Sequence, residues 1–165
     1  MPVDRDRPFA SIIDAARRRP RRIAFPEAED ARTLTAARGL ADDRIAWPVL
    51  VGNPDAVAAA ARAAGVAFDG LDILDAGDTE RRRRYCESLG PVLERRGLRP
   101  DELASLLADP LYFAAAAVRC GVADGSVAGA VHTTAETLRA ALRVIRPAPD
   151  ARIVSSFFLM ALREP

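Results

Sequence analysis

Residues 125–145 read GSVAGAVHTTAETLRAALRVI, which is the most informative stretch of the chain. Small residues at 126–130 predict a strand, which runs into a threonine-containing turn and then into a helix at 134–145. Thr133 and Glu136 have the spacing of a capping box, in which the two side chains satisfy free N–H groups at a helix start. The stretch is therefore a strand–turn–helix unit, the building block of a layered α/β fold.

The rest of the chain repeats the alternation of helical and strand-like patterns. We expect further helices at 8–19, 29–40, 54–64, 81–96, 101–107 and 111–120, and further strands at 22–25, 47–51, 71–74 and 153–160. The strands are short and apolar, as strands covered on both faces should be. The sequence thus predicts an α/β fold of three layers, with a mostly parallel sheet flanked by helices. A proline-rich stretch at 147–150 divides it into a domain at 1–148 and the start of a second domain at 149–165.

Two helical faces are also predicted. The helix at 111–120 is apolar nearly all round and should be buried. In the helix at 134–145, Leu138, Leu142 and Ile145 follow a helical period, so we expect them to form its buried stripe.

Composition excludes several classes of function. The chain has 165 residues, of which 50% are apolar, and a formal net charge of +1, so neither a nucleic acid nor a membrane is expected as a partner. Arginine runs at 17–22 and 81–84 are more typical of solvated faces than of anion sites. Cys86 and Cys120 lack CxxC spacing, so we expect no metal site or disulfide framework and a reducing, cytoplasmic setting. Residues 1–7 lack the apolar segment of an export signal.

The turn before the helix at 134–145 is the candidate binding site. Free N–H groups and the helix dipole favour an anion at a helix start, and Gly129 would let a ligand approach the backbone closely. Arg139 offers a planar fork for phosphate, although spacing alone favours an exposed pair with Glu136. His132 is the only histidine, and a single loop histidine is weak evidence for a ligand contact.

Four ordered segments carry a family resemblance. These are RRIAFPEAEDARTLTAA (21–37), PVLVGNPDAV (48–57), ADGSVAGAVHTTAETLRAALRVI (123–145) and IVSSFFLM (153–160). Together they resemble the phosphate acyltransferases, which include phosphotransacetylases and phosphotransbutyrylases, over nearly the whole chain. The acyltransferase-like C-terminal region of some malic enzymes shares these motifs and stays an alternative.

The resemblance implies reversible transfer of an acyl group, most often acetyl, between coenzyme A and inorganic phosphate. Coenzyme A would be a substrate rather than a bound cofactor, the other substrates would be phosphate and acyl phosphate, and no metal is implied. In the family the thiolate of coenzyme A attacks the carbonyl of the acyl phosphate, and phosphate leaves. Arg139, which matches the arginine of the TLR motif, would bind phosphate together with Thr133, Thr134, His132 and Gly129.

Two departures from the family pattern bear on activity. A family arginine aligns with Leu93, and a side chain two positions away, at Arg95, would point about 200° round the helix. The family's general-base aspartate lies in a C-terminal half, so we expect this chain to be a truncated N-terminal half with no certain catalytic residue. The alternatives are a subunit completed by a separate second half, a non-catalytic phosphate-binding remnant, and a partner of a complete homologue. The apolar strand at 153–160 would then be an unpaired edge, which favours a homo-oligomer or pairing with a missing half.

Overall fold

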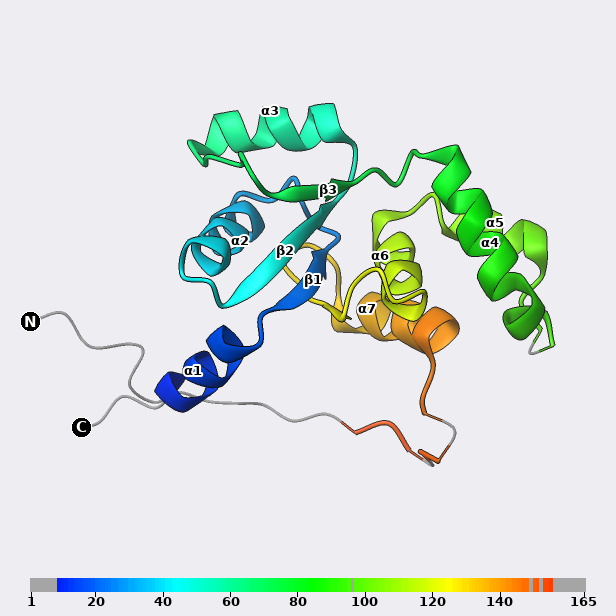
Figure 1. Cartoon of the computed structure of the whole chain (residues 1–165). Coiled ribbons are helices and arrows are strands. Elements are labelled where there is room, and N and C mark those ends of the chain that lie inside the picture. The colour runs from blue at the N-terminus through cyan, green and yellow to red at the C-terminus, as the bar shows by residue number, and fades with distance from the viewer. Residues whose placement is uncertain (1–8, 96, 149, 152, 156–165) are drawn as a thin grey trace, which may run out of the picture.

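The computed structural model of the chain describes residues 9–95, 97–148, 150–151 and 153–155. Its helices are α1 (Ala10–Arg18), α2 (Ala31–Asp42), α3 (Pro54–Ala64), α4 (Thr79–Glu94), α5 (Pro100–Leu106), α6 (Pro110–Arg119) and α7 (Thr134–Ala140), and α7 continues as the π-helical turn η2 (Ala141–Ile145). The strands are β1 (Arg21–Phe25), β2 (Ala46–Val51), β3 (Asp72–Leu74) and β4 (Gly125–Ser126) (Figure 1). The predicted alternation is confirmed over the described residues, with small shifts at the ends of the elements.

All the pairings in the sheet are parallel, and its strand order is β3-β2-β1-β4. The chain leaves β1 towards β2 and β3 on one side and returns through α4, α5 and α6 to place β4 on the other side. The hydrogen-bonded pairing of β1 with β4 is short: Ile23 lies opposite Gly125, and Ala24 lies opposite Ser126. The predicted small-residue strand at 126–130 is thus only partly correct, because β4 begins one residue earlier and ends at Ser126.

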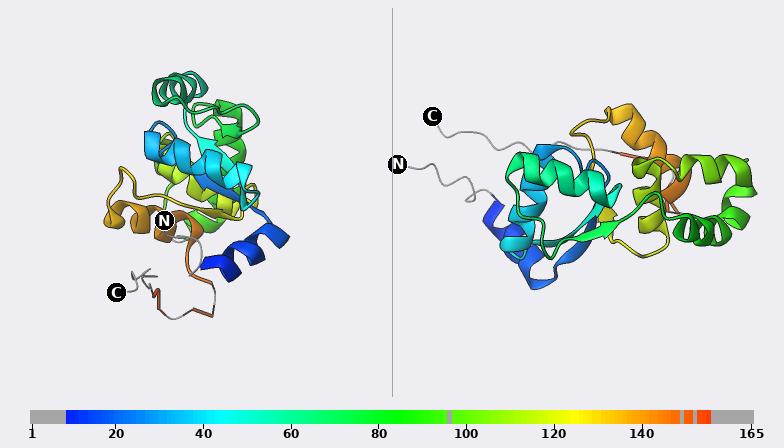
Figure 2. Two further views of the ribbon diagram at one scale, coloured as in Figure 1. Left: turned by 90° about the vertical axis from the view of Figure 1, so that its left-hand side faces the viewer. Right: turned by 90° about the horizontal axis from the view of Figure 1, so that it is seen from above.

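Alternate residues of the strands face opposite layers, as the pleat requires. Ala24 and Val49 belong to a core cluster that also contains residues of α4, α5 and α6. Phe25 and Leu50, their neighbours along the strands, belong to a second cluster with residues of α2 and α3. The three predicted layers are therefore confirmed, and Figure 2 shows helices on both faces of the sheet.

Helix α6 is the centre of the larger cluster. Phe113 and the four alanines that follow it are almost completely buried, so the prediction of a buried helix in this segment is confirmed. The ring of Phe113 packs against that of Tyr85 in α4 with centroids 5.1 Å apart. Helices α4 and α5 lie on the far side of α6 from the sheet (Figures 1 and 2).

The buried face of α7 and η2 differs from the predicted one. Of the predicted stripe, Leu138 and Leu142 are each 44% exposed, whereas Ile145 is partly buried against the core cluster, as predicted; Ala140 and Val144 are buried as well. Val144 joins the core cluster built on α6, whose surface of small alanines accepts a closely packed neighbour. At Leu138 and Leu142 the buried positions lie two residues further along the helix than predicted, which corresponds to about 200° round a helix.

The two ends of the chain also refine the predictions. Helix α1 forms within the predicted range 8–19, but it has no buried residue, and Ile12 is 54% exposed. Residues 153–155 of the predicted last strand are exposed and not in a strand. The remainder of that strand, 156–160, lies outside the described residues, as do residues 1–7 and most of the predicted second domain.

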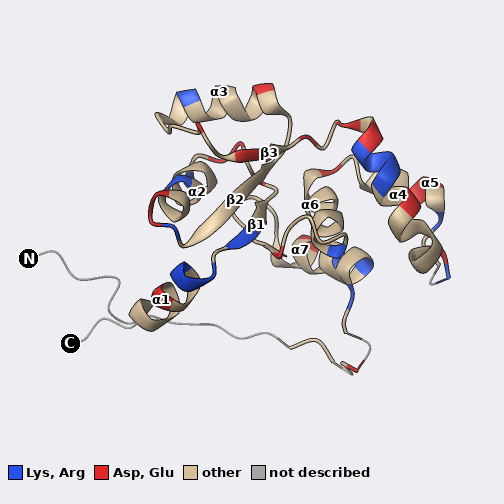
Figure 3. Cartoon of the chain, in the orientation of Figure 1, with Lys and Arg blue, Asp and Glu red and all other residues tan. Residues whose placement is uncertain are grey.

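The arginine run at 81–84 lies on α4, where Figure 3 shows basic and acidic residues next to one another along the helix. Arg83 pairs with Glu80 one turn earlier at 2.8 Å and also with Glu87 one turn later. These exposed pairs support the interpretation of this run as a solvated face.

Candidate functional site

The strand order places a topological switch point at the carboxyl ends of β1 and β4. The chain leaves β1 in one direction and β4 lies on the other side, so the two loops that follow these strands diverge at this point. In open parallel sheets, such a switch point is where ligands usually bind. The loop after β1 begins with Pro26 and Glu27, and the loop after β4 leads through residues 127–133 into α7.

Glu27 is buried at this point and binds the opposite loop. Its side chain is only 3% exposed. One oxygen, Oε2, accepts the backbone N–H groups of Gly129 at 2.9 Å and Ala130 at 2.7 Å. The other, Oε1, accepts those of Val131 at 2.8 Å and His132 at 2.7 Å. Four consecutive N–H groups therefore converge on one carboxylate.

This arrangement changes the acidity of Glu27. Burial raises its pKa, but the N–H groups of His132, Val131 and Ala130 and the His132 ring together outweigh burial and lower the pKa from 4.5 to about 2. A carboxylate that accepts several backbone N–H bonds is stabilised in its charged form. Glu27 is therefore ionised at neutral pH.

A residue at the start of α2 also binds the loop that follows β4. Asp30 caps α2 by accepting the N–H groups of Arg32 and Thr33. The guanidinium of Arg32 bonds the Asp30 carboxylate at 3.0 and 2.9 Å and donates to the Ala130 carbonyl oxygen at 2.6 Å. The hydrogen bonds to Arg32 hold the pKa of Asp30 at about 2. One peptide segment thus has its N–H groups bound by Glu27 and a carbonyl bound by Arg32.

The predicted capping box is present at the start of α7. Glu136 accepts both the N–H of Thr133 at 2.7 Å and its hydroxyl at 2.8 Å, and the hydroxyl accepts the N–H of Glu136 at 3.3 Å. These bonds lower the pKa of Glu136. Among the described residues, the N–H groups of Thr134 and Ala135 have no hydrogen-bond partner, so they are the donors that remain for a ligand.

Arg139 lies one turn further along α7 and is exposed. No carboxylate of the described residues lies within 4 Å of its guanidinium, so the alternative of a close pair with Glu136 is not what the structure shows. Helical side chains lean towards the N-terminus, and residues three or four apart share a face. Arg139 therefore shares the face of Ala135 at the start of the helix.

The five predicted site residues divide into two groups. Gly129 and His132 face Glu27 through their backbone N–H groups, and Thr133 is used in the cap. Gly129 has a φ of +117°, which favours glycine, so its backbone conformation gives this position a structural reason to be glycine. Thr134 and Arg139 are exposed. The role of all five as ligands of phosphate stays a prediction.

Sequence reasoning missed Glu27 as a site residue. The signal for it was an acidic residue directly after a buried strand, facing the carboxyl edge of the sheet. Nothing local paired this residue with a loop more than a hundred positions later.

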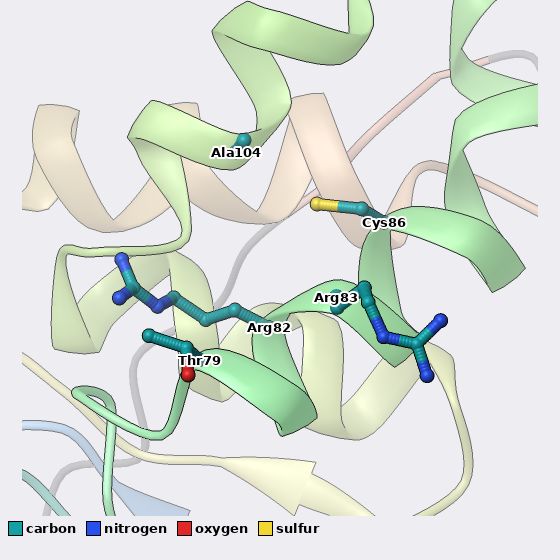
Figure 4. Close-up of a pocket in the computed structure, with 5 residues that line it drawn as sticks. All are labelled: Thr79, Arg82, Arg83, Cys86 and Ala104. Carbon is teal, nitrogen blue, oxygen red and sulfur yellow. The ribbon is translucent and has the colours of Figure 1, made fainter.

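Two surface hollows differ in their relation to this loop. One of about 200 Å³ is lined by residues of both loops and of α2: Phe25, Glu27, Arg32, Thr33, Ala36, Val127, Ala128 and Ala130. The other, of about 320 Å³, lies between α4 and α5, where the sulfur of Cys86 points into the hollow and Arg83 turns away from Arg82 (Figure 4). Burial raises the pKa of the Cys86 thiol, which makes it a poor nucleophile. The smaller hollow is therefore the one beside the candidate loop, although Thr134 and Arg139 are not among the residues that line it.

The described residues contain no group of three or more His, Cys, Asp or Glu side chains placed to bind a metal ion. Nor does any helix within the described ranges combine the length and the apolar character needed to cross a bilayer.

Comparisons with known proteins agree with this geometry. The sequence profile of the phosphate acetyl/butaryl transferases matches residues 9–165. The chain belongs to this family. It is 36% identical to the phosphate acetyltransferase of Thermoanaerobacterium thermosaccharolyticum over 91% of this chain and 45% of that protein. It is 40% identical to the phosphate acetyltransferase of Paracoccus denitrificans over 93% of this chain and 45% of that protein. The chain spans about 45% of the length of these curated relatives.

Solved structures of the family share the fold. The EutD phosphotransacetylase from Staphylococcus aureus superposes with a TM-score of 0.77 at 26% identity, over 87% of this chain and 44% of that one. A phosphotransacetylase from Streptococcus pyogenes superposes with a TM-score of 0.71 at 27% identity, over 86% of this chain and 44% of that one. The predicted fold class and family are both confirmed.

One departure from the family pattern is visible in the structure. Leu93 is 2% exposed and lies in the core cluster built on α6. Arg95 is exposed at the C-cap of α4, where its Nε donates to the Pro91 carbonyl oxygen at 3.1 Å, and Arg96 lies outside the described residues. The position of Leu93 therefore presents no side chain to a ligand.

Proposed function

We propose that this chain takes part in the reversible transfer of an acetyl group between coenzyme A and inorganic phosphate, and that it binds the phosphate side of the reaction. Membership of the phosphate acetyl/butaryl transferase family supports the reaction class. The relatives named above are phosphate acetyltransferases, which favours acetyl as the acyl group. Coenzyme A, phosphate and acetyl phosphate would all be substrates, and no permanently bound group is required.

The observation that carries the proposal is the group of unused donors at the start of α7. The N–H groups of Thr134 and Ala135 are free among the described residues, and Arg139 is exposed one turn away. Backbone N–H groups at a helix start and an arginine fork are both suited to phosphate oxygens. The loop that leads into α7 follows β4 at the switch point of the sheet, where a ligand is expected, and this supports the proposal.

The chemistry would use these donors on the leaving group. The thiolate of coenzyme A attacks the carbonyl carbon of acetyl phosphate, the bond from that carbon to the bridging oxygen breaks, and phosphate leaves with the electron pair. Negative charge therefore grows on the phosphate oxygens in the transition state. A positioned donor aimed at such charge typically contributes about 3 to 4 kcal/mol. Arg139 would be the strongest donor because it is permanently charged.

A second candidate function is binding of phosphate or acetyl phosphate without catalysis, as a remnant or as the partner of a complete homologue. The burial of Leu93 favours it, because an arginine of the family pattern is absent there. The internal use of Thr133 in the cap favours it as well, because it removes a hydroxyl from the set of phosphate ligands.

The test is phosphate-dependent release of coenzyme A from acetyl-CoA by the purified chain, compared with Arg139→Ala. Calorimetric titration with inorganic phosphate is run on the same samples. Arg62→Ala is the matched control, because Arg62 is an exposed arginine in the last turn of α3, in another layer of the fold. Activity that is lost only in Arg139→Ala supports the transferase. Phosphate binding without activity supports the second candidate, and the absence of both contradicts the proposed site.

A further inference from the structure

We propose that Glu27 is a positioning residue of the candidate site, which fixes the His132 ring with its proton on Nδ1 and leaves Nε2 as the nitrogen that meets a ligand. The identity of that ligand as phosphate or acetyl phosphate rests on the proposed function. The state of the ring does not.

The first step of the argument is that Glu27 can only accept hydrogen bonds. Five contacts reach its two oxygens: the four consecutive N–H groups of residues 129–132 and the ring nitrogen Nδ1 of His132 at 2.9 Å. Each backbone N–H is an obligatory donor, so a proton on either oxygen of Glu27 would face a donor at less than 3 Å. The low pKa of the carboxyl agrees with this geometry.

The second step concerns the histidine. A carboxylate without a proton has nothing to donate, so the contact at 2.9 Å requires a proton on Nδ1. In a neutral imidazole the other nitrogen then carries a lone pair, and in the charged ring both nitrogens carry protons. In the neutral ring Nε2 therefore carries the lone pair. It lies on the side of the ring away from Glu27, and the side chain is 28% exposed.

The third step links this ring to the donors of the proposed site. His132 is followed directly by the capping residue Thr133 and by Thr134 at the start of α7. Two residues before His132, the N–H of Ala130 donates to Glu27 and the carbonyl oxygen of Ala130 accepts from Arg32. The entry of the chain into α7 is thus held by side chains from the β1–α2 loop and the first turn of α2. A ligand at Thr134 and Arg139 would find Nε2 already oriented, either to accept a proton from monohydrogen phosphate or to donate one when the ring is charged.

The experiment uses the fact that the chain has a single histidine. Nitrogen NMR of chain labelled with ¹⁵N in histidine reports the protonation of Nδ1 and Nε2 separately and without overlap. We expect the neutral ring of the natural chain to carry its proton on Nδ1. Glu27→Gln should move the neutral ring towards the form protonated on Nε2 and tighten phosphate binding about tenfold, because Nε2 becomes a donor and a nearby negative charge is removed. Glu29→Gln, an exposed acidic neighbour, is the matched control and should change neither.

The outcomes separate the two proposals. A neutral ring protonated on Nε2 in the natural chain overturns the role of Glu27, and this result does not depend on whether any variant folds. An unchanged tautomer together with unchanged phosphate affinity in folded Glu27→Gln overturns it too. If the natural chain shows the Nδ1 proton but binds no phosphate, the proposed function fails while the control of His132 by Glu27 stands.

Discussion

Replacing Glu27 by glutamine should destabilise the fold in a manner that depends on pH. Glutamine has the same shape, but it cannot carry the charge that four N–H groups and the His132 ring surround. The difference between the ordinary pKa of 4.5 and the folded-state pKa of about 2 corresponds to about 3 kcal/mol, at roughly 1.4 kcal/mol per tenfold change. Solvent at the rim of the loop screens part of this, so we expect a loss of about 2 to 3 kcal/mol in the free energy of unfolding at neutral pH.

The pH dependence gives the sharper test. Because the pKa of Glu27 is lower in the folded state, its contribution is fully present above the unfolded value of 4.5 and is lost as pH falls towards about 2. We would follow urea unfolding of the natural chain and of Glu27→Gln by circular dichroism, from about pH 7 down to about pH 3. The difference between their free energies of unfolding should shrink in the acid range. Asp30 also has a pKa of about 2 but is present in both chains, so its effect cancels. A difference in the free energy of unfolding that stays constant across this range, or that is below about 0.5 kcal/mol at neutral pH, would contradict this role of Glu27.

Three further outcomes are expected. Phe113→Ala should lower the free energy of unfolding by about 3 to 5 kcal/mol, measured by urea titration, because the ring is fully buried at the centre of the α6 cluster. Thr133→Ala should cost about 1 kcal/mol in the same assay through loss of the cap, and an unchanged midpoint would contradict the capping role. The chain should self-associate in sedimentation at micromolar concentration, because Val131, Ile153 and Val154 are 68, 81 and 56% exposed; a clean monomer would count against this.

Local chemistry made most of the fold predictable. The predicted capping box at Thr133 is present, and the helix predicted at 54–64 begins after Asn53, whose side chain accepts its first free N–H groups. The second source of information was the alternation of residues between the two faces of the sheet along each strand. Ala24 and Phe25 are neighbours in β1 yet belong to different core clusters, as short apolar strands between two helical layers require.

The errors occurred where packing overrode the local pattern. The periodic leucines Leu138 and Leu142 were expected inside, but the alanine face of α6 is matched by the smaller Ala140 and Val144. The helix also changes to a π-helical turn at Ala141, which alters the angular spacing on which the prediction relied. The pattern of side chains along one helix does not show the shape of the neighbouring helix surface against which it packs.

The electrostatics of the candidate site also depend on contacts that the local sequence does not show. A helix start preceded by a small-residue turn predicts an anion site, and an anion is indeed bound by this turn, but it is the chain's own Glu27. Its contacts span more than a hundred residues, so only the pairing of β1 with β4 brings them together. The charge of Glu27 offsets the partial positive charge of the four N–H groups, and a phosphate placed there would meet a carboxylate rather than free donors. We therefore expect a ligand to use the outward side, at Thr134, Ala135 and Arg139, where Glu27 would position the loop that leads to these groups rather than compete for what they bind.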